Sequence, residues 1–259
     1  MLAVSFSQKV SFLTVWLTCF KWSVPNYLSN CPLGVLIAAV YISMGIPGVL
    51  LLILPLMVAR QSFIMYMDMG NQYISTIKAL TKAIEAKDHY THGHSERVAR
   101  YVVQIAEEMG LPADYIEKLE YLALMHDVGK IGVPEHILNK PNRLSEEEFE
   151  LVRNHAVIGA EIISTIKFIG EHSHIVRHHH ERVDGRGYPD GLTGDDIPLG
   201  AKIVGVADAF DAMTSERVYR APLTRAEAIE ELKRCSGSQF DPKVVKAFLK
   251  VLERKGESG

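Results

Sequence analysis

The residues from Tyr121 to Gly132 read YLALMHDVGKIG and carry the strongest indication of the fold. The first five are apolar, as in a buried helix, and the adjacent His126 and Asp127 come at the end of that run. An imidazole and a carboxylate are costly to bury without partners, and a bound cation removes that cost. The stretch therefore predicts a buried helix that ends in a pair of candidate metal ligands.

Helical patterns with recognisable ends lie on both sides of this stretch. Two capping boxes, Ser145-Glu-Glu-Glu148 and Thr224-Arg-Ala-Glu227, open helices, and no alternating β pattern is present. Residues 81–259 therefore predict an all-α helical bundle of about seven helices, interrupted by a Gly-rich loop at Asp184–Pro198. The predicted helices include Ser95–Met109, Asp114–Asp127, Ser145–Ile166, Ala226–Arg234 and Pro242–Leu252.

Composition divides the 259 residues into two unlike parts. Residues 1–60 contain Lys9, Lys21 and Arg60 but no Asp or Glu, whereas the remaining 199 residues carry 25 basic and 31 acidic side chains. The net charge of −3 offers no electrostatic basis for binding a nucleic-acid polymer. The three cysteines form neither a disulfide framework nor a CxxC metal site, so any metal must be held by nitrogen and oxygen.

The apolar part predicts a membrane anchor. No charged residue occurs from Trp22 to Ala59, and about 20 apolar residues in a helix are enough to cross the hydrocarbon core of a bilayer. We expect a membrane-anchoring region at 1–60, with its main span at about 33–59 and a kink near Gly45–Pro47. A second span at about 10–28 is an open alternative, and a cleaved signal peptide is disfavoured because no clear cleavage site follows the first apolar run.

The region after the main span leads into the helical domain at residues 81–259. Residues 61–80 have apolar side chains at helical spacing and predict a linker helix, which could also join two copies as a homodimer. Arg60, Lys78, Lys82 and Lys87 follow the span. By the positive-inside rule, these cations favour a cytoplasmic domain at the inner membrane.

The histidines are strongly clustered. All eleven lie between His89 and His180, and an isolated one such as His136 is better explained as a hydrogen-bonded surface or core residue. Taken together, however, five imidazoles and two carboxylates on separate helical segments suit a pair of divalent metal ions. These seven residues are His94, His126, Asp127, His155, His179, His180 and Asp208.

The order of these residues carries a resemblance. It matches the HD superfamily of metal phosphohydrolases, and the run from His179 to Leu192, HHERVDGRGYPDGL, resembles the hallmark of the HD-GYP branch. The resemblance covers residues 81–259. Supporting blocks are YTHGHSERV at 90–98, HDVGKIG at 126–132, DAFDAMTS at 208–215 and QFDP at 239–242.

The resemblance implies a bacterial phosphodiesterase that hydrolyses the second messenger cyclic di-GMP to pGpG and often continues to GMP. It makes the seven residues ligands of two divalent metal ions about 3.5–4 Å apart, with Asp127 bridging them and a shared water attacking phosphorus. Lys130 resembles the family lysine that contacts the scissile phosphate, where a fixed cation stabilises the transition state. Asp127 and Lys130 are therefore the expected catalytic residues, and the alternative for Lys130 is a solvated surface lysine.

Further roles follow from the same resemblance. Tyr188 is expected to pack against a guanine, with Gly187 allowing the loop to approach the ligand closely. Arg217 and Arg220 are expected to bind phosphate or guanine through paired hydrogen bonds. Two carboxylates match family positions beside the site and are expected to support a ligand histidine from behind: Glu85 and Asp88.

One departure from the family pattern bears on the metal count. Some members place a carboxylate four residues before the first ligand histidine and bind a third metal, whereas this chain has Tyr90 there. We therefore expect a binuclear centre of iron or manganese. The adjacent His178 leaves the ligand assignment open by one position.

Two other functions stay open at the level of the sequence. One is a receptor that binds cyclic di-GMP or a signalling protein without hydrolysis, which is disfavoured because no ligand of the family pattern is missing. The other is a phosphohydrolase for another nucleotide, such as a cyclic GMP-AMP dinucleotide or a guanosine tetraphosphate, and the GYP loop argues against the latter.

Overall fold

The computed structural model describes residues 12–87, 93–215 and 221–256, with side chains described from residue 31 onward except at 66–74 and 255–256. The chain divides into two compact units, residues 1–71 and 72–259, and each is described by itself. The described ranges contain helices and two isolated β-bridges but no strand. The predicted all-α class is therefore confirmed.

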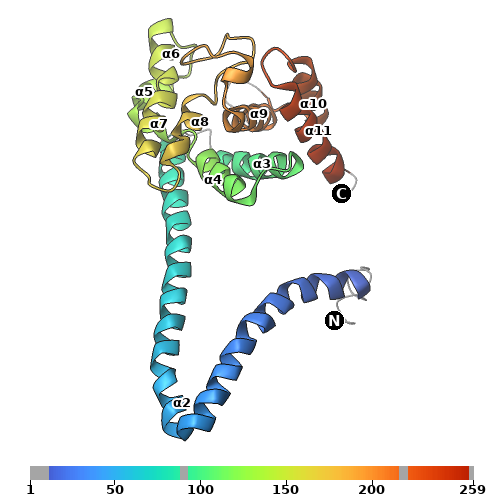
Figure 1. Cartoon of the computed structure of the whole chain (residues 1–259). Coiled ribbons are helices and arrows are strands. Elements are labelled where there is room, and N and C mark those ends of the chain that lie inside the picture. The colour runs from blue at the N-terminus through green and yellow to red at the C-terminus, as the bar shows by residue number, and fades with distance from the viewer. Residues whose placement is uncertain (1–11, 88–92, 216–220, 257–259) are drawn as a thin grey trace. The chain divides into compact units, whose positions relative to one another are not determined.

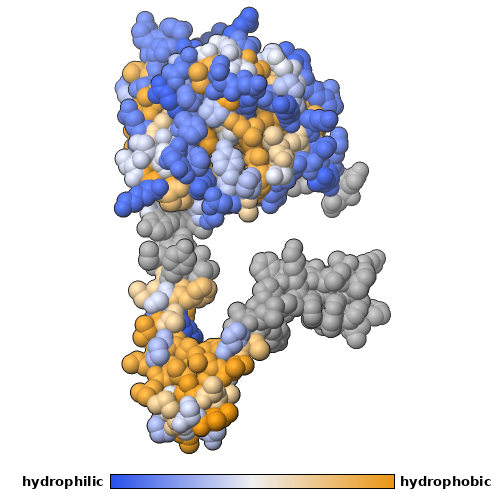
Figure 2. Space-filling view, in the orientation of Figure 1, coloured by the Kyte–Doolittle hydropathy of each residue, from blue (hydrophilic) through white to orange (hydrophobic). Residues whose placement is uncertain are grey.

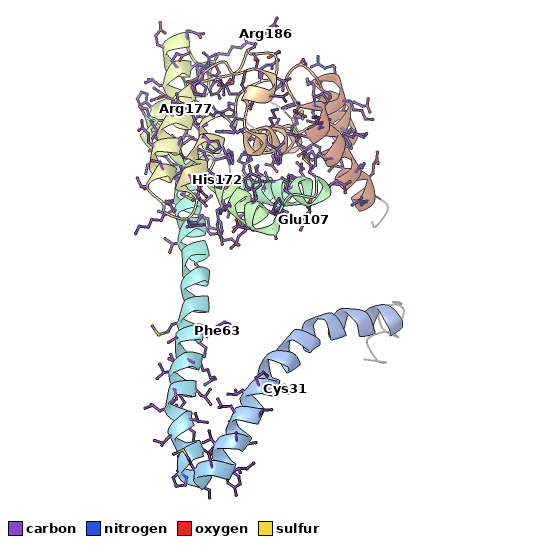
Figure 3. The ribbon with its side chains drawn as sticks, viewed as in Figure 1. Cys31, Phe63, Glu107, His172, Arg177 and Arg186 are labelled. Carbon is purple, nitrogen blue, oxygen red and sulfur yellow. The ribbon has the colours of Figure 1, made fainter. Side chains whose placement is uncertain are left out.

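The first unit consists of helical chain that belongs to α2 (Phe12–Lys87). The helix is interrupted at Gly45, whose φ of 66° and ψ of −156° are not helical, at the position of the predicted kink. Residues Cys31–Met65 are long and apolar enough to cross a membrane. Their exposed side chains, Cys31 and Phe63 among them, project from the helix, and Figures 2 and 3 show this apolar surface. The predicted main span lies within this segment, whereas the side chains of the predicted second span lie outside the described residues.

The second unit is built around α9 (Leu199–Thr214), which lies in the middle of the packed helices in Figure 1. The longer helices that pack on it or on one another are α3 (His94–Glu108), α4 (Ala113–Leu124), α10 (Arg225–Arg234) and α11 (Pro242–Gly256). A further helix, α7 (His155–Ser164), packs mainly on short helices. Short helices complete the unit: η1 (Val128–Gly132), α5 (Glu135–Leu138), α6 (Glu146–Arg153), η2 (Gly170–His172), α8 (Ser173–Arg177) and η3 (Gly194–Asp196).

The core of this unit holds α9 in place. Ile203 and Phe210 on α9 are almost completely buried, and the ring of Phe210 packs edge-on against Phe248 at 5.0 Å and against Tyr101 at 5.4 Å. Burying a side chain of this size contributes about 1.5–3 kcal/mol. The helix that carries Asp208 is thus fixed by α3 and α11.

Two predicted helices differ from the observed ones, both next to a predicted ligand. The single helix predicted at 145–166 is divided at Asn154 into α6 and α7, where the carbonyl of Val152 accepts a hydrogen bond from the His155 ring at 2.6 Å. The helix predicted to reach Asp127 ends at Leu124, and the chain then turns into η1. Both breaks place predicted ligands at or beside a helix end. The two predicted capping boxes are confirmed.

Candidate metal centre

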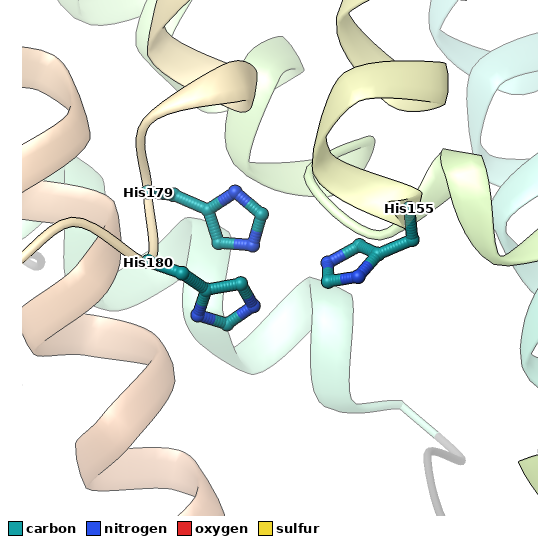
Figure 4. A group of neighbouring side chains, drawn as sticks. All are labelled: His155, His179 and His180. Carbon is teal, nitrogen blue, oxygen red and sulfur yellow. The ribbon is translucent and has the colours of Figure 1, made fainter. Parts of the chain in front are cut away.

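The seven predicted metal ligands converge inside the second unit. They come from the start of α3, the turn between α4 and η1, the start of α7, the segment after α8, and α9. Figure 4 shows three of the rings, which face a common space between α7 and the segment after α8. In three overlapping groups the ligand atoms all lie within 4.8 Å of one another: His155, His179 and His180; His94, His126 and Asp208; and His126, Asp127 and His179.

Three of the rings are held by the same backbone interaction. His126, His155 and His179 each place Nδ1 at 2.6–2.7 Å from the carbonyl oxygen three residues earlier in the chain. A neutral imidazole that donates from Nδ1 keeps a lone pair on Nε2. The backbone therefore selects the tautomer that can bind a cation through Nε2.

The Nε2 atoms of these three histidines have no hydrogen-bond partner among the described residues, although each residue is at most 2% exposed. An unsatisfied buried acceptor costs about 1–3 kcal/mol. Divalent cations in these groups would satisfy all three, and imidazole with carboxylate is a donor set that iron, manganese and zinc accept. The residues present thus fit a metal ion.

Burial also keeps several of these rings neutral. Burial lowers the pKa of His180 to about 3, and it lowers the pKa values of His155 and His179 as well. Metal binding needs neutral imidazoles, because a protonated ring has no lone pair to donate. These three rings therefore keep a lone pair for a metal ion at neutral pH.

Asp127 lies between the two histidine groups. Its Oδ1 is 3.4 Å from His155 Nε2, and its Oδ2 is 3.5 Å from His126 Nε2. Lys130 Nζ contacts the same Oδ2 at 2.7 Å. Burial raises the pKa of Asp127, but Lys130 and the histidines outweigh burial and hold this pKa well below its usual range. One carboxylate oxygen thus faces each group, as a bridging ligand requires.

His94 is held by two carboxylates. Its Nε2 is 3.2 Å from Asp208 Oδ1 and its Nδ1 is 2.7 Å from Asp211 Oδ2. Burial lowers the pKa of His94, but the hydrogen bonds to both carboxylates outweigh it and raise this pKa to about 9. Asp208 takes the position of a ligand, whereas Asp211 orients the ring from behind.

Asp211 lies in the DAFDAMTS block at 208–215, but no role was predicted for it from the sequence. The side chain is 1% exposed and accepts hydrogen bonds from Arg97 Nε at 2.7 Å, Arg97 at a second nitrogen at 3.0 Å, and Ser215 Oγ at 3.2 Å. A usable signal was present, because Asp208 and Asp211 stand three apart and therefore share one face of a helix.

Glu85 supports His94 through the backbone. Its two carboxylate oxygens accept hydrogen bonds from the N–H groups of Gly93 at 2.8 Å and Ser95 at 3.0 Å, which flank His94 at the start of α3. These are N–H groups that a helix start leaves without intrahelical partners. The predicted supporting position of Glu85 beside the site fits this arrangement.

Two glycines let ligand-bearing backbones touch. A Cβ on Gly129 would lie 1.9 Å from the carbonyl oxygen of His155, and one on Gly205 would lie 2.6 Å from the carbonyl oxygen of His179. Any larger residue at these positions would separate η1 from α7, or α9 from the segment after α8. The motif glycine after the His-Asp pair therefore brings Asp127 and His155 together.

A cleft of about 240 Å³ opens beside the metal ligands. His180 and Asp208 line it together with Gly187 and Tyr188, and the Tyr188 ring lies 4.8 Å from the His180 ring. Its cationic side chains are Arg153, Arg182, Arg186 and Lys202. The predicted substrate residues Tyr188 and Gly187 thus lie in a cleft of positive character.

The loop that carries Tyr188 is fixed by its own residues. Glu181 accepts hydrogen bonds from the backbone N–H groups of Asp190, Gly191 and Leu192 at 2.7–3.1 Å. Asp190 in turn contacts His178 Nε2 at 2.9 Å and receives two bonds from Arg177. His178 therefore anchors the loop, and its neighbours His179 and His180 face the centre. The predicted residues Asp88, Arg217 and Arg220 lie outside the described residues.

Comparison with known proteins agrees with this geometry. Residues 78–244 match the model of the family described as HD domain. A curated cyclic di-GMP phosphodiesterase of Thermotoga maritima is 42% identical over 197 residues, which are 74% of this chain and 52% of that protein. A 3'3'-cGAMP-specific phosphodiesterase 2 of Vibrio cholerae is 37% identical over 66% of this chain and 33% of that protein. The chain therefore spans about half or less of the length of these relatives.

A solved structure has the same fold. Bd1817, described as an HDG"Y"P protein from Bdellovibrio bacteriovorus, superposes with a TM-score of 0.51 at 23% identity, over 62% of this chain and 51% of that one. The fold and the site together define an all-α domain whose inward-facing imidazoles and carboxylates could hold metal ions. The chain belongs to the HD domain family, which confirms its predicted resemblance to the HD superfamily.

Proposed function

We propose that this chain is a membrane-anchored, metal-dependent phosphodiesterase that hydrolyses cyclic di-GMP. The observation that carries the proposal is the set of three buried Nε2 atoms that have no hydrogen-bond partner among the described residues. These atoms are arranged around Asp127, beside a cleft lined by four basic and two acidic side chains. Nothing in a purely structural core requires buried imidazoles to face one another in this way.

Two divalent ions, iron or manganese, would be held by the seven ligands. His94, His126 and Asp208 form one group, His155, His179 and His180 form the other, and Asp127 faces both. When bound, such a pair lowers the pKa of a water molecule and offsets charge on the phosphate oxygens.

The other groups of the site bind and orient the substrate. Lys130, next to Asp127, supplies a fixed positive charge for the scissile phosphate. Tyr188 offers a ring face on which a guanine can stack, and the guanidinium of Arg153 lies 5.4 Å from the centre of that ring. Arg186 is exposed at the cleft and has no ion pair among the described residues (Figure 3), so its charge is available to a phosphate.

The experiment uses the full chain, purified anaerobically in detergent and supplied with Mn(II) or Fe(II). We expect conversion of cyclic di-GMP to pGpG, followed chromatographically, with slower release of GMP. A His126→Ala, Asp127→Ala double variant should be inactive, whereas His136→Ala should be as active as wild type because His136 is an exposed histidine outside the cluster. A folded, metal-loaded wild type that binds cyclic di-GMP but releases no product would contradict the proposal and favour a receptor.

A second candidate substrate is 3'3'-cGAMP, because a relative specific for it is 37% identical. The two substrates share a guanine and both phosphodiesters and differ in one base. To decide between cyclic di-GMP and 3'3'-cGAMP, kcat/KM is measured for each, and each is tested as a competitor of the other's hydrolysis.

The anchor and its orientation complete the proposal. The span within Cys31–Met65 would hold the domain at the inner membrane, and the cations from Arg60 onward support a cytoplasmic domain. The helix of residues 61–80 would provide a dimer contact, and signalling proteins are further candidate partners.

A further inference from the structure

The last turns of α2 contact the segment that follows His126 and Asp127. Lys87 Nζ donates hydrogen bonds to the carbonyl oxygens of Lys130 at 3.3 Å, Ile131 at 2.9 Å and Val133 at 2.5 Å. Nearly two turns earlier along α2, buried Thr81 donates to the carbonyl oxygen of Leu124 at 3.1 Å. The end of α2 therefore holds the chain on both sides of the His-Asp pair.

The three carbonyl oxygens that Lys87 contacts lie close together, and an ammonium group suits them. A helix end leaves its last carbonyls without intrahelical donors and carries partial negative charge. An ammonium group has three donors and no acceptor, so it can satisfy three such oxygens at once. Lys87 thus supplies a donor to the carbonyls of Ile131 and Val133 and a second donor to the carbonyl of Lys130, which also accepts from Val133 N–H.

The main chain of Lys87 is fixed as well. Its carbonyl oxygen accepts a hydrogen bond from Asn139 Nδ2 at 2.9 Å, so a residue beyond the 130–133 turn contacts Lys87 as well. Within the turn, Lys130 N–H donates to the Asp127 carbonyl at 3.0 Å and Val133 N–H donates to the Lys130 carbonyl at 3.1 Å. The backbone of Lys130 is thereby held from two directions, while its Nζ contacts Asp127.

We propose that Lys87 is a positioning residue that fixes Lys130 for catalysis. The inference rests on the proposed function, because it assigns Lys130 to the scissile phosphate. Lys87 acts through the backbone of the 130–133 turn and touches neither a predicted ligand side chain nor the cleft. A displacement of about 1 Å at a catalytic group can cost 100-fold in rate.

The test is Lys87→Met in the full-length, metal-loaded protein, because methionine keeps the length of the side chain and removes the ammonium. We expect kcat for cyclic di-GMP to fall about 10- to 100-fold with less than a threefold change in KM and with unchanged metal content. The control is Lys82→Met on the same helix, where the side chain is 69% exposed and lies 4.0 Å from Glu96. That variant should behave as wild type.

A double-mutant cycle with Lys130→Ala separates positioning from general stability. If Lys87 acts through Lys130, adding Lys87→Met to Lys130→Ala should lower kcat by less than twofold. Additive losses, loss of metal from Lys87→Met, or unchanged kcat in Lys87→Met would each overturn the inference. An inactive wild type would overturn the proposed function instead.

Should Lys87→Met fail to fold, the same cycle is run with Asn139→Ala, which leaves the ammonium in place and frees the Lys87 carbonyl. We expect a smaller loss of kcat, about two- to fivefold, that disappears in the Lys130→Ala background. A loss of the same size in both backgrounds would overturn the inference.

Discussion

The histidines of this site differ in the protonation state that their surroundings favour. His94 is raised in pKa by the carboxylates of Asp208 and Asp211, while His155, His179 and His180 are kept neutral by burial. The same buried cluster therefore contains one imidazole that favours the protonated form and three that favour the neutral form. Divalent ions resolve this conflict because they replace the proton on His94 and use the lone pairs of the others.

Asp211 is predicted to maintain metal affinity by orienting His94. Asp211→Asn removes the negative partner of His94 and Arg97, so the ligand ring loses its orientation. We expect metal affinity to fall about 10- to 100-fold, measured by chelator competition and metal analysis. The control, Asp195→Asn, changes an exposed carboxylate and should bind metal as wild type does. Equal affinity in both variants would show that Asp211 does not support the centre.

The metal-free protein should be acid-sensitive. The folded-state pKa values of His155, His179 and His180 lie below the ordinary value of 6.5, so these rings contribute stability above pH 6.5 that is lost as the pH falls. For His180, whose pKa is about 3, the free energy of unfolding falls between pH 6.5 and about pH 3, by up to about 1.4 kcal/mol per pH unit.

The raised pKa of His94 acts in the other direction. The stabilisation of the folded state by His94 is complete below pH 6.5 and is lost as the pH rises through about 9. We therefore expect the midpoint of thermal unfolding of the chelator-treated chain to peak near neutral pH and to fall more steeply on the acid side. A midpoint independent of pH between 4 and 7 would contradict the buried neutral rings.

At the scale of elements, close backbone contact assembles the centre. Gly129→Ala would place a methyl group 1.9 Å from the His155 carbonyl, so η1 and α7 must separate. We expect a loss of about 1–3 kcal/mol in unfolding free energy together with reduced metal content, measured by denaturant unfolding and metal analysis. In Gly132→Ala the nearest atom is the Ile158 side-chain tip at 2.7 Å, which can rotate, so this control should retain its metal.

Much of this assembly could be predicted from the sequence. The seven ligands follow one another in a recognisable order, and the capping boxes open the helices where the local pattern places them. Local patterns could not predict contacts between distant segments. Asp211 meets His94 across 117 positions, and Lys87 meets the Lys130 carbonyl across 43, and no periodicity records such pairs. The break at Asn154 was missed for a related reason, because the His155 ring competes for a backbone carbonyl.

At the scale of the whole molecule, the topology of the chain can be tested with its own cysteine. Cys235 is partly exposed in the second unit, whereas Cys31 lies on the apolar segment. In a Cys19→Ser, Cys31→Ser background, we expect a membrane-impermeant maleimide to label Cys235 in inverted membrane vesicles and not in right-side-out ones. Labelling only in right-side-out vesicles would reverse the predicted orientation, and release of the chain by alkaline carbonate would rule out a span.

The backbone bonds to His126, His155 and His179 have a consequence for the supply of the cofactor. Because the main chain aims these rings, the cage keeps its shape before any ion arrives. Several first-row divalent ions accept such nitrogen and oxygen donors, and metal availability is one of the factors that decide which of them is bound. The growth medium should then decide which element is recovered with the protein.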